Sequence, residues 1–426
     1  MNVPNPVLIK IRQSFPRPVV KDAPAAMAAE MKKLLTAADV KPGQTVGITG
    51  GSRGIQNQIP TLRSAIAAVR EFGATPVILA AMGSHGGGTA KGQFEMLSSL
   101  GITKENLGVE IRTCDVGREL GFTKSGLQAY ILEHAFSVDH IVPINRVKIH
   151  TSFHGELESG CVKKLVVGLG GPSGARQFHS IGKLSELSRV LEEIGTLILE
   201  KMPVIGGIAL VENAFEETAL IQAMPRETMI QDEKKILEFS RSLMPSLPVD
   251  DMHALIIEET GKNYSGTGMD PNILGRLLVQ GELEPVKPAI RYLAVLDMSE
   301  ASHGNATGIG YADFTTKKLV DKIDRKATYL NCLTSTFPKR ARIPMYFDTE
   351  KDVVEAILRC LSGNVAPDDL RIIVVPNTLF LTEMYVSEAI YNELRARDNI
   401  EKIGDPVRFS FTEEGDMQPR IGIYAH

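Results

Sequence analysis

Two Gly-rich turns in the first half of the chain each carry one side chain suited to chemistry. Residues 46–56 read VGITGGSRGIQ and present Arg53, whose planar guanidinium can bind a carboxylate through two parallel hydrogen bonds. Residues 80–93 read AAMGSHGGGTAKGQ and place His85 before three glycines. An imidazole titrates near neutral pH, so His85 can donate or accept a proton. The alternatives are a solvated arginine and a histidine that only caps a loop.

Three more histidines lie in the segment from 146 to 179. His150 and His154 are four residues apart, the spacing of a metal-binding pair on a helix, and His179 follows a Gly-rich turn. The glycine, threonine and phenylalanine around the first pair predict a loop, and no His-Glu-x-x-His motif is present. These features disfavour a zinc hydrolase, which we keep only as an alternative.

The same segment contains two adjacent lysines, Lys163 and Lys164, directly before an apolar run. We expect this run to form a strand over Leu165–Gly168. A lysine at a buried boundary loses its charge readily and can become a nucleophile. Because neighbouring residues of a strand face opposite sides, at most one of the two lysines would face a binding site. Two solvated lysines at the start of a strand are the alternative.

The first Gly-rich turn is close to the dinucleotide-binding loop of short-chain dehydrogenases, which makes an NAD-type oxidoreductase an alternative. That loop needs a final glycine so that its helix can pack against the strand, and this chain has Gln56 there. None of the nine tyrosines is followed by a lysine four residues later, as the Tyr-x-x-x-Lys helix of that family requires. Both departures disfavour a nicotinamide enzyme.

The elements that position these residues alternate between apolar runs and helix-period segments, which predicts parallel sheets flanked by helices. We expect strands at Thr45–Thr49, Pro76–Ala81, His140–Ile144, Ile205–Val211, Leu293–Asp297, Ile372–Val375 and Arg420–Tyr424. We expect helices at Ala25–Leu35, Thr61–Phe72, Glu186–Glu200, Asp352–Ser362 and Thr382–Arg397. The predicted fold class is α/β, with two Rossmann-like domains and an active-site cleft between them.

The predicted domain boundary rests on length and composition. A chain of 426 residues exceeds what one hydrophobic core usually supports. Residues 243–290 are rich in Pro, Gly and Asp, which is typical of a crossover between domains. We expect an N-terminal domain over 1–250 that carries the catalytic motifs and a C-terminal domain over 251–405 that closes the cleft. Segment 406–426 is expected to return to the first domain.

Composition narrows the class of function. The net charge is −4 and the Lys and Arg residues are scattered, which disfavours a nucleic-acid partner. No apolar run approaches the ~20 residues that span a bilayer, and the N-terminus lacks the pattern of a signal peptide. The four cysteines include no Cys-x-x-Cys pair. We therefore expect a cytoplasmic protein that acts on a small molecule, with homo-oligomerisation left open.

Taken in order, the motifs resemble those of the nickel-pincer lactate racemase family. Ser-Arg follows the first strand, Gly-Ser-His-Gly-Gly follows the second, and Ser-Gly-x-x-Lys ends at Lys163. Phe-His-Ser then places His179 sixteen residues beyond that lysine. The resemblance covers most of residues 40–180, whereas the second half of the chain resembles the family only in general character.

The resemblance implies a nickel pincer nucleotide, which is pyridinium-3,5-bisthiocarboxylic acid mononucleotide with bound nickel. It implies that Lys163 forms a thioamide with one arm of the cofactor and that His179 coordinates nickel. The mononucleotide phosphate would lie at a Gly-rich turn. The residues that we expect at the cofactor are Gly50, Ser52, Gly86 and Gly87. The cofactor-biosynthesis enzymes would be partners, and protein produced without them would lack the cofactor.

The implied activity is racemisation or epimerisation of a 2-hydroxy acid. One histidine removes the hydroxyl proton while hydride moves from C2 to the pincer carbon, and return of hydride to the other face inverts the centre. His85 matches one base; for the second we favour His154, with His150 left open. Arg53 matches the arginine that holds the substrate carboxylate.

Neither the second half of the chain nor the Ser-Gly-x-x-Lys motif identifies the substrate. Lys262 and His303 lie in polar loops that could complete the substrate site. Cys161 and Val162 stand where lactate-acting members have Gly and Arg, so the resemblance does not fix lactate as the substrate. The alternative functions are a cofactor-free small-molecule-binding protein of the same fold and the NAD-type oxidoreductase.

Overall fold

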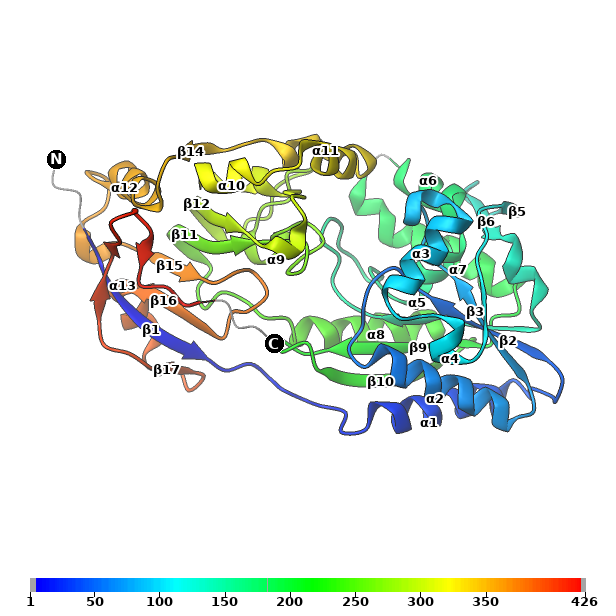
Figure 1. The fold of residues 1–426 in the computed structure, drawn as a ribbon. Helices are drawn as coiled ribbons and strands as arrows, with labels where there is room; N and C mark the ends of the chain where they lie inside the picture. Colours follow the sequence, from blue (N-terminus) through cyan, green and yellow to red (C-terminus); the bar gives the residue numbers. More distant parts are fainter. Residues whose placement is uncertain (1–4, 182, 423–426) are drawn as a thin grey trace. The chain divides into compact units, whose positions relative to one another are not determined.

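The computed structural model describes residues 5–181 and 183–422. The chain divides into two compact units (Figure 1). One unit contains residues 16–244, and the other combines the residues up to 15 with those from 245 onward. Among the described residues, no helix combines the length and apolar character needed to cross a bilayer. Each unit is built around its own sheets, as an α/β chain of this length predicts.

The unit of residues 16–244 contains a four-stranded parallel sheet. Its strand order is β4 (Glu110–Arg112), β3 (Thr75–Ala80), β2 (Thr45–Gly50) and β7 (His140–Val142). A three-stranded sheet follows in the order β8 (Ile144–Arg146), β9 (Gly206–Glu212) and β10 (Thr218–Pro225). Strand β8 continues β7 after Pro143, and Thr49 Oγ1 accepts the Ile144 N–H at 3.1 Å. Strands β2, β3, β7 and β8 therefore run in the same direction.

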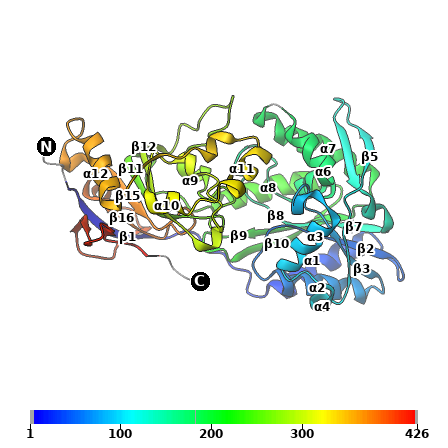
Figure 2. The same ribbon diagram turned by 45° about the horizontal axis from the view of Figure 1, so that its top comes forward.

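Both faces of this sheet are covered by helices. Alternate residues of β3 face opposite sides: Ile78 packs in a core with α1 and α2, whereas Val77 and Leu79 pack in a second core with α7. Figure 2 shows α1 and α2 on one side of the strands and α7 on the other. These helices are α1 (Ala23–Ala37), α2 (Gln58–Glu71) and α7 (Leu187–Lys201). The parallel sheet flanked by helices confirms the predicted fold class.

The first helix shows why these sequences form the elements they do. Met27, Met31 and Leu34 recur at three- and four-residue spacing in α1, and all three are buried. Asp22 caps the helix, because its carboxylate accepts the Ala25 N–H at 2.9 Å. The apolar stripe and the cap together fix where α1 begins and which face it buries.

The other unit contains one mixed sheet of nine strands. The order is β14 (Met345–Phe347), β13 (Phe314–Thr316), β12 (Ala289–Met298), β11 (Asp251–Thr260), β15 (Ile372–Val375), β16 (Glu383–Ser387), β1 (Val7–Gln13) and β17 (Ile400–Lys402), with β18 (Val407–Arg408) also paired to β1. The pairs among β11, β12, β13, β14 and β15 are parallel, whereas β16 runs antiparallel to both of its neighbours, β15 and β1. Helix α12 (Glu350–Leu361) packs on this sheet, in agreement with the predicted helix.

The division at residues 244/245 lies inside the predicted crossover 243–290 and close to the expected limit at 250, but the two ends of the chain do not follow the expected domain limits. Strand β1, near the N-terminus, pairs with β16, β17 and β18 and so belongs to the unit of residues 245 onward. The described part of segment 406–426 belongs to that unit as well. Backbone pairing between distant parts of the chain decides this, and residue composition carries no signal for it.

Four predicted elements are wrong. The expected strand Leu165–Gly168 is a π-helical turn, Lys164–Leu169, because a short apolar run does not distinguish a buried helix from a strand. The expected crossover 243–290 contains the central strand β11. The expected helix Thr382–Arg397 begins with strand β16, and only Glu388–Leu394 is helical (α13). Residues 420–422 form no strand, and the rest of the expected strand Arg420–Tyr424 lies outside the described residues.

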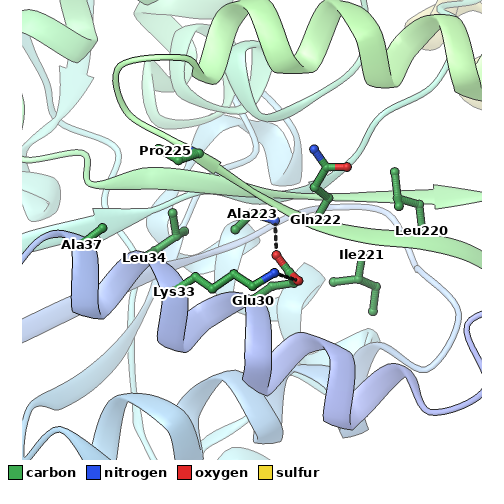
Figure 3. A pocket seen from close by; sticks show the side chains of 9 residues that line it. All are labelled: Glu30, Lys33, Leu34, Ala37, Leu220, Ile221, Gln222, Ala223 and Pro225. Carbon is green, nitrogen blue, oxygen red and sulfur yellow. Dashed lines mark hydrogen bonds and ion pairs between the residues drawn. The ribbon is translucent and has the colours of Figure 1, made fainter.

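A groove of 480 Å³ lies between α1 and β10 (Figure 3). Glu30 accepts the Ala223 N–H at 2.8 Å and pairs with Lys33 at 2.6 Å. Strand β10 is the edge of its sheet, so this carboxylate satisfies an edge N–H that would otherwise be open to another strand. None of the sequence-predicted site residues lines the groove. We therefore interpret the groove as part of the contact between α1 and β10 and not as the binding site.

A buried carboxylate holds the beginning of α5 (Cys161–Lys163), the helix that carries the predicted nucleophile. Glu233 of α8 (Met229–Ser242) accepts the Cys161 N–H at 2.6 Å and the Val162 N–H at 3.1 Å. Its side chain has no cationic partner among the described residues, and burial raises its pKa to about 7 despite the two N–H donors. Glu233 therefore positions α5, and its carboxyl group titrates close to neutral pH.

This arrangement predicts that the free energy of unfolding depends on pH through the carboxyl group of Glu233. The folded-state pKa lies above the ordinary value of 4.5, so the folded protein binds a proton that the unfolded chain releases between these two values. The free energy of unfolding of the wild type, relative to Glu233→Gln, should fall by about 1–3 kcal/mol from pH 4.5 to pH 8. Urea unfolding at several pH values measures this difference. Parallel pH profiles for the two proteins would contradict it, and Glu238→Gln, on the exposed face of α8, serves as the control.

Candidate active site

The candidate site lies at the carboxyl ends of three strands of the first unit. Residues 51–57 follow β2, residues 81–89 follow β3, and residues 147–160 follow β8. Because these strands run in the same direction, their following loops emerge at one edge of the sheet, where α/β proteins bind ligands. The Gly83 N–H also bonds to the Gly168 carbonyl at 3.1 Å, which ties the loop after β3 to the π-helical turn after α5.

Ser52 and His85, which we expected near the ligand, contact each other. Ser52 Oγ lies 2.5 Å from His85 Nδ1, so the loops after β2 and β3 are joined by a side-chain hydrogen bond. The glycines after His85 allow this loop to close: a Cβ on Gly92 would lie 1.8 Å from the Gly86 carbonyl oxygen. Gly86 and Gly87 both have positive φ, at 66° and 67°. The hydrogen bond fixes one side of an exposed imidazole ring.

Lys163 lies among aromatic rings on the same edge. Its Nζ is 5.1 Å from the centroid of Phe153 and 5.9 Å from that of Phe178. Burial lowers the pKa of Lys163 to about 7, because Glu158 raises it only in part and Lys148 lowers it further. A substantial fraction of this amine is therefore neutral at pH 7, which is the nucleophilic form.

His179 ends α6 (Gly171–His179) beside this lysine. Its ring centroid is 5.3 Å from that of Phe178, in an edge-to-face arrangement. Partial burial of the ring, and then the charge of Lys163, lower the pKa of His179 to about 4, although the residue as a whole is exposed. The imidazole is therefore neutral at pH 7, the form that binds metal ions.

His150 packs at a tilt against Phe153, the other aromatic ring of the cluster. Its ring centroid is 4.3 Å from that of Phe153, and its Nδ1 accepts the Ser152 N–H at 3.1 Å. This hydrogen bond leaves the proton of the neutral ring on Nε2. Burial, followed by the charges of Lys163 and His179, lowers the pKa of His150 well below its ordinary value. His150 therefore packs as a neutral ring.

A single buried carboxylate organises the loop that carries both histidines. Glu158 accepts the His150 N–H at 2.5 Å and the Gly155 N–H at 3.1 Å, and its Oε2 lies 3.5 Å from His154 Nδ1. Arg241 donates to the same carboxylate at 2.6 Å. Burial alone would raise the pKa of Glu158, but His154, the His150 N–H and Arg241 bring the net pKa below its ordinary value. The sequence offered one signal for this residue, its four-residue spacing from His154.

Arg53 projects from the loop after β2 and is exposed. Partial burial of the guanidinium, and then the charge of Arg146, lower its pKa. Arg146 itself pairs with Glu212, which also accepts the Gln56 N–H at 3.1 Å. The Gln56 side chain in turn accepts the Thr218 N–H at 3.1 Å. The residue that replaces the last glycine of a dinucleotide loop thus anchors this loop to β9 and β10.

The other predicted site residues lie in the core of the first unit or in the other unit. Gly50 ends β2 in the core, where a Cβ would lie 3.0 Å from side-chain atoms of Ile78 and Leu97. Lys262 and His303 belong to the other unit, in the loops after β11 and β12. Lys262 Nζ donates to Asn331 Oδ1 at 2.5 Å. Their expected roles in substrate binding stay predictions.

No metal centre is made by protein side chains alone in the described part of the chain, where no three His, Cys, Asp or Glu side chains gather closely enough to hold a metal ion. His150 and His154 do not form the helical metal pair that their spacing suggested, because they lie in a loop organised by Glu158. The cluster instead offers a neutral amine, a neutral imidazole and two aromatic rings. Such a set fits a ligand that brings its own metal donors.

We expect Glu158→Gln to lower the free energy of unfolding by about 1–3 kcal/mol, because an amide NH2 group cannot accept one of the two backbone N–H groups that the buried carboxylate accepts, and it weakens the bond from Arg241. Chemical denaturation measures the change. The matched control is Glu156→Gln in the same loop: Glu156 pairs with Lys234 at the surface, and its loss should cost about 0.5 kcal/mol or less. Equal effects of the two variants would show that Glu158 does not organise the loop.

The fold of this chain is similar to those of solved structures. The structure is similar to that of the lactate racemase apoprotein from Thermoanaerobacterium thermosaccharolyticum, with a TM-score of 0.51 and 13% sequence identity, over 87% of this chain and 98% of that chain. A structural-genomics target from Thermotoga maritima matches with a TM-score of 0.44 and 13% identity, over 64% of this chain and 70% of that chain. No family model matches the sequence, and no curated protein matches it.

The match extends over both units and nearly the whole length of the racemase apoprotein. The sequence motifs that suggested a lactate-racemase-like protein lie in residues 40–180, whereas the structural likeness also includes most of the second half. The resemblance is therefore confirmed at the level of the fold: this chain has the α/β fold of the lactate racemase apoprotein.

Proposed function

We propose that this protein is an isomerase that racemises or epimerises a small 2-hydroxy acid with a lysine-tethered nickel pincer nucleotide. The observation that carries the proposal is the aromatic cluster at the sheet edge, where a lysine with a pKa of about 7 and a histidine with a pKa of about 4 lie together. The fold shared with a lactate racemase apoprotein supports the same class of reaction.

The residues of the cluster suit the cofactor. Lys163 supplies an amine that can be acylated, and His179 supplies a neutral imidazole donor. Phe153 and Phe178 offer apolar surfaces to a pyridinium ring. Nickel(II) accepts sulfur, carbon and imidazole donors, so His179 can complete a donor set that comes mostly from the cofactor. When bound, the cofactor supplies the site that accepts the C2 hydride and returns it.

The chain's own residues bind the acid and move its proton. Arg53 follows β2, which lies between β3 and β7 in the sheet, and it would hold the substrate carboxylate through two hydrogen bonds. His85 follows β3, and His154 follows β8, the continuation of β7. The two histidines thus come from strands on either side of the one that carries the arginine. This strand order supports the proposal, because the two histidines would approach the substrate from different sides, as a two-base racemase needs.

In this proposal one histidine accepts the hydroxyl proton as the C2–H bond breaks. The other donates a proton to the same oxygen when the C–H bond forms again on the opposite face. Ser52 fixes the ring of His85, and Glu158 lies beside Nδ1 of His154. His150 is less suited to proton transfer, because burial keeps its ring neutral and its Nδ1 is occupied by the Ser152 N–H.

The proposed tether predicts a covalent adduct. Protein co-expressed with the cofactor-biosynthesis enzymes should carry the cofactor on Lys163, and peptide mass spectrometry should distinguish this residue from Lys164. Lys163→Ala should lose the adduct and the activity while retaining its fold by circular dichroism. Unmodified protein that binds 2-hydroxy acids would indicate a cofactor-free binding protein, and bound nicotinamide would indicate an oxidoreductase.

The proposed proton transfer predicts that His85→Asn lowers turnover by about 10²–10⁴-fold and leaves the adduct intact. Turnover is measured as inversion of C2-deuterated acids, with retention of deuterium, across a panel of 2-hydroxy acids. His140→Asn is the control, since His140 starts β7 at the opposite edge of the sheet and bonds to Gln44. Loss of the adduct in His85→Asn would make His85 a structural residue.

A further inference from the structure

The second lysine of the pair reaches a different place from the first. Successive residues of a helix point about 100° apart, so Lys163 and Lys164 diverge although they are neighbours. A Cβ on Gly51 would clash with Lys164 Nζ. Gly51 does not have a positive φ, so this close approach, and not the backbone conformation, is what requires a glycine there. The ammonium group of Lys164 therefore lies against the loop after β2.

Lys164 keeps its charge but has no counter-ion among the described residues. Burial, offset in part by Cys161, lowers the pKa of Lys164 to about 8, so the amine is still mostly protonated at pH 7. No hydrogen bond or ion pair involves its Nζ in this part of the chain. Glu233 binds the start of α5, and Glu212 accepts the Gln56 N–H of the same loop. A partly buried cation without an anion is costly, which indicates an anionic ligand.

Three consecutive residues of this loop connect the ammonium group to a base and to a second cation. Gly51 lies against Lys164. The next residue, Ser52, has its Oγ 2.5 Å from His85 Nδ1, and Arg53 follows with an exposed side chain. Two residues of extended chain span at most about 7 Å, so both cations meet the same short piece of backbone. The Arg53 guanidinium also makes no hydrogen bond or ion pair within residues 5–181 and 183–422.

We propose that Lys164 binds a second anionic group of the substrate, so that the preferred substrate is a 2-hydroxy dicarboxylate. This inference rests on the proposed function, in which Arg53 holds the carboxylate beside C2 and His85 meets the hydroxyl group. The planar fork of arginine suits the carboxylate that must be held in one orientation, whereas lysine binds as a compact point charge on a flexible stem. An acid with a single carboxylate would leave one of the two cations without an anion.

Matched pairs of acids isolate the contribution of the second carboxylate. Malate and 2-hydroxybutyrate have carbon chains of equal length and differ only in a terminal carboxylate or methyl group, and 2-hydroxyglutarate and 2-hydroxypentanoate form a longer pair. Ligand-observed NMR titrations of the apoprotein give the dissociation constants, and inversion of C2 by the cofactor-loaded enzyme gives kcat/KM. In at least one pair, the wild type should favour the dicarboxylate by about 10-fold or more, which is the effect of one hydrogen bond to a charged group.

Two variants assign this preference to Lys164. Lys164→Met should remove most of it, whereas Lys91→Met, a change at an exposed lysine of α3 (Ala90–Ser99), should retain it. If Lys164→Met does not fold, Gly51→Ala provides a second test, because its methyl group would occupy the place of the ammonium group and should also reduce the preference. A preference that persists in either variant would overturn the proposal, as would a wild type that shows no preference in either pair.

Failure of this inference can be distinguished from failure of the proposed function. Inversion of monocarboxylates and dicarboxylates with equal efficiency would support the proposed function and overturn the role of Lys164. Binding of dicarboxylates that depends on Lys164, by a protein that inverts none of the acids when loaded with cofactor, would support the role of Lys164 and contradict the proposed function.

Discussion

The hydrogen bonds from the Cys161 and Val162 N–H groups to Glu233 hold the helix on which the candidate site depends. These bonds fix the first turn of the helical segment that begins at Cys161. The helical backbone then directs the two adjacent lysines to different places. Lys163 enters the aromatic cluster with Phe153 and Phe178, and Lys164 reaches the Gly-rich loop at Gly51. An extended backbone would have sent them to opposite faces of a sheet.

The charge balance of the site depends on which groups its buried carboxylates bind. Glu158 meets Arg241, His154 and two N–H groups, and its pKa falls below the ordinary value. Glu233 meets only N–H groups, and its pKa rises to about 7. Because these acids serve the backbone and Arg241, the cations that face the ligand are only weakly compensated. A site of this kind favours the anionic ligands that the proposed function requires.

The sequence predicted much of the scaffold. The strands before the two Gly-rich turns and the helices that flank them are confirmed, because apolar periodicity depends on which face is buried and can be seen locally. The contact between Ser52 and His85 was not predicted, although consecutive parallel strands that end at one edge bring the two loops together. The strand expected at Leu165–Gly168 is wrong, because a short apolar run with glycines fits a buried helix equally well.

What the sequence by itself determined was the α/β class and the set of reactive side chains at the strand ends, since both depend on local patterns. Only the tertiary structure decided which lysine lies among the aromatic rings, that Glu158 serves both His150 and His154, and that β1 joins the strands from residues 245 onward. The physical reason is that burial, pKa and strand pairing depend on contacts between residues far apart in the chain. No local pattern of residue types encodes those contacts.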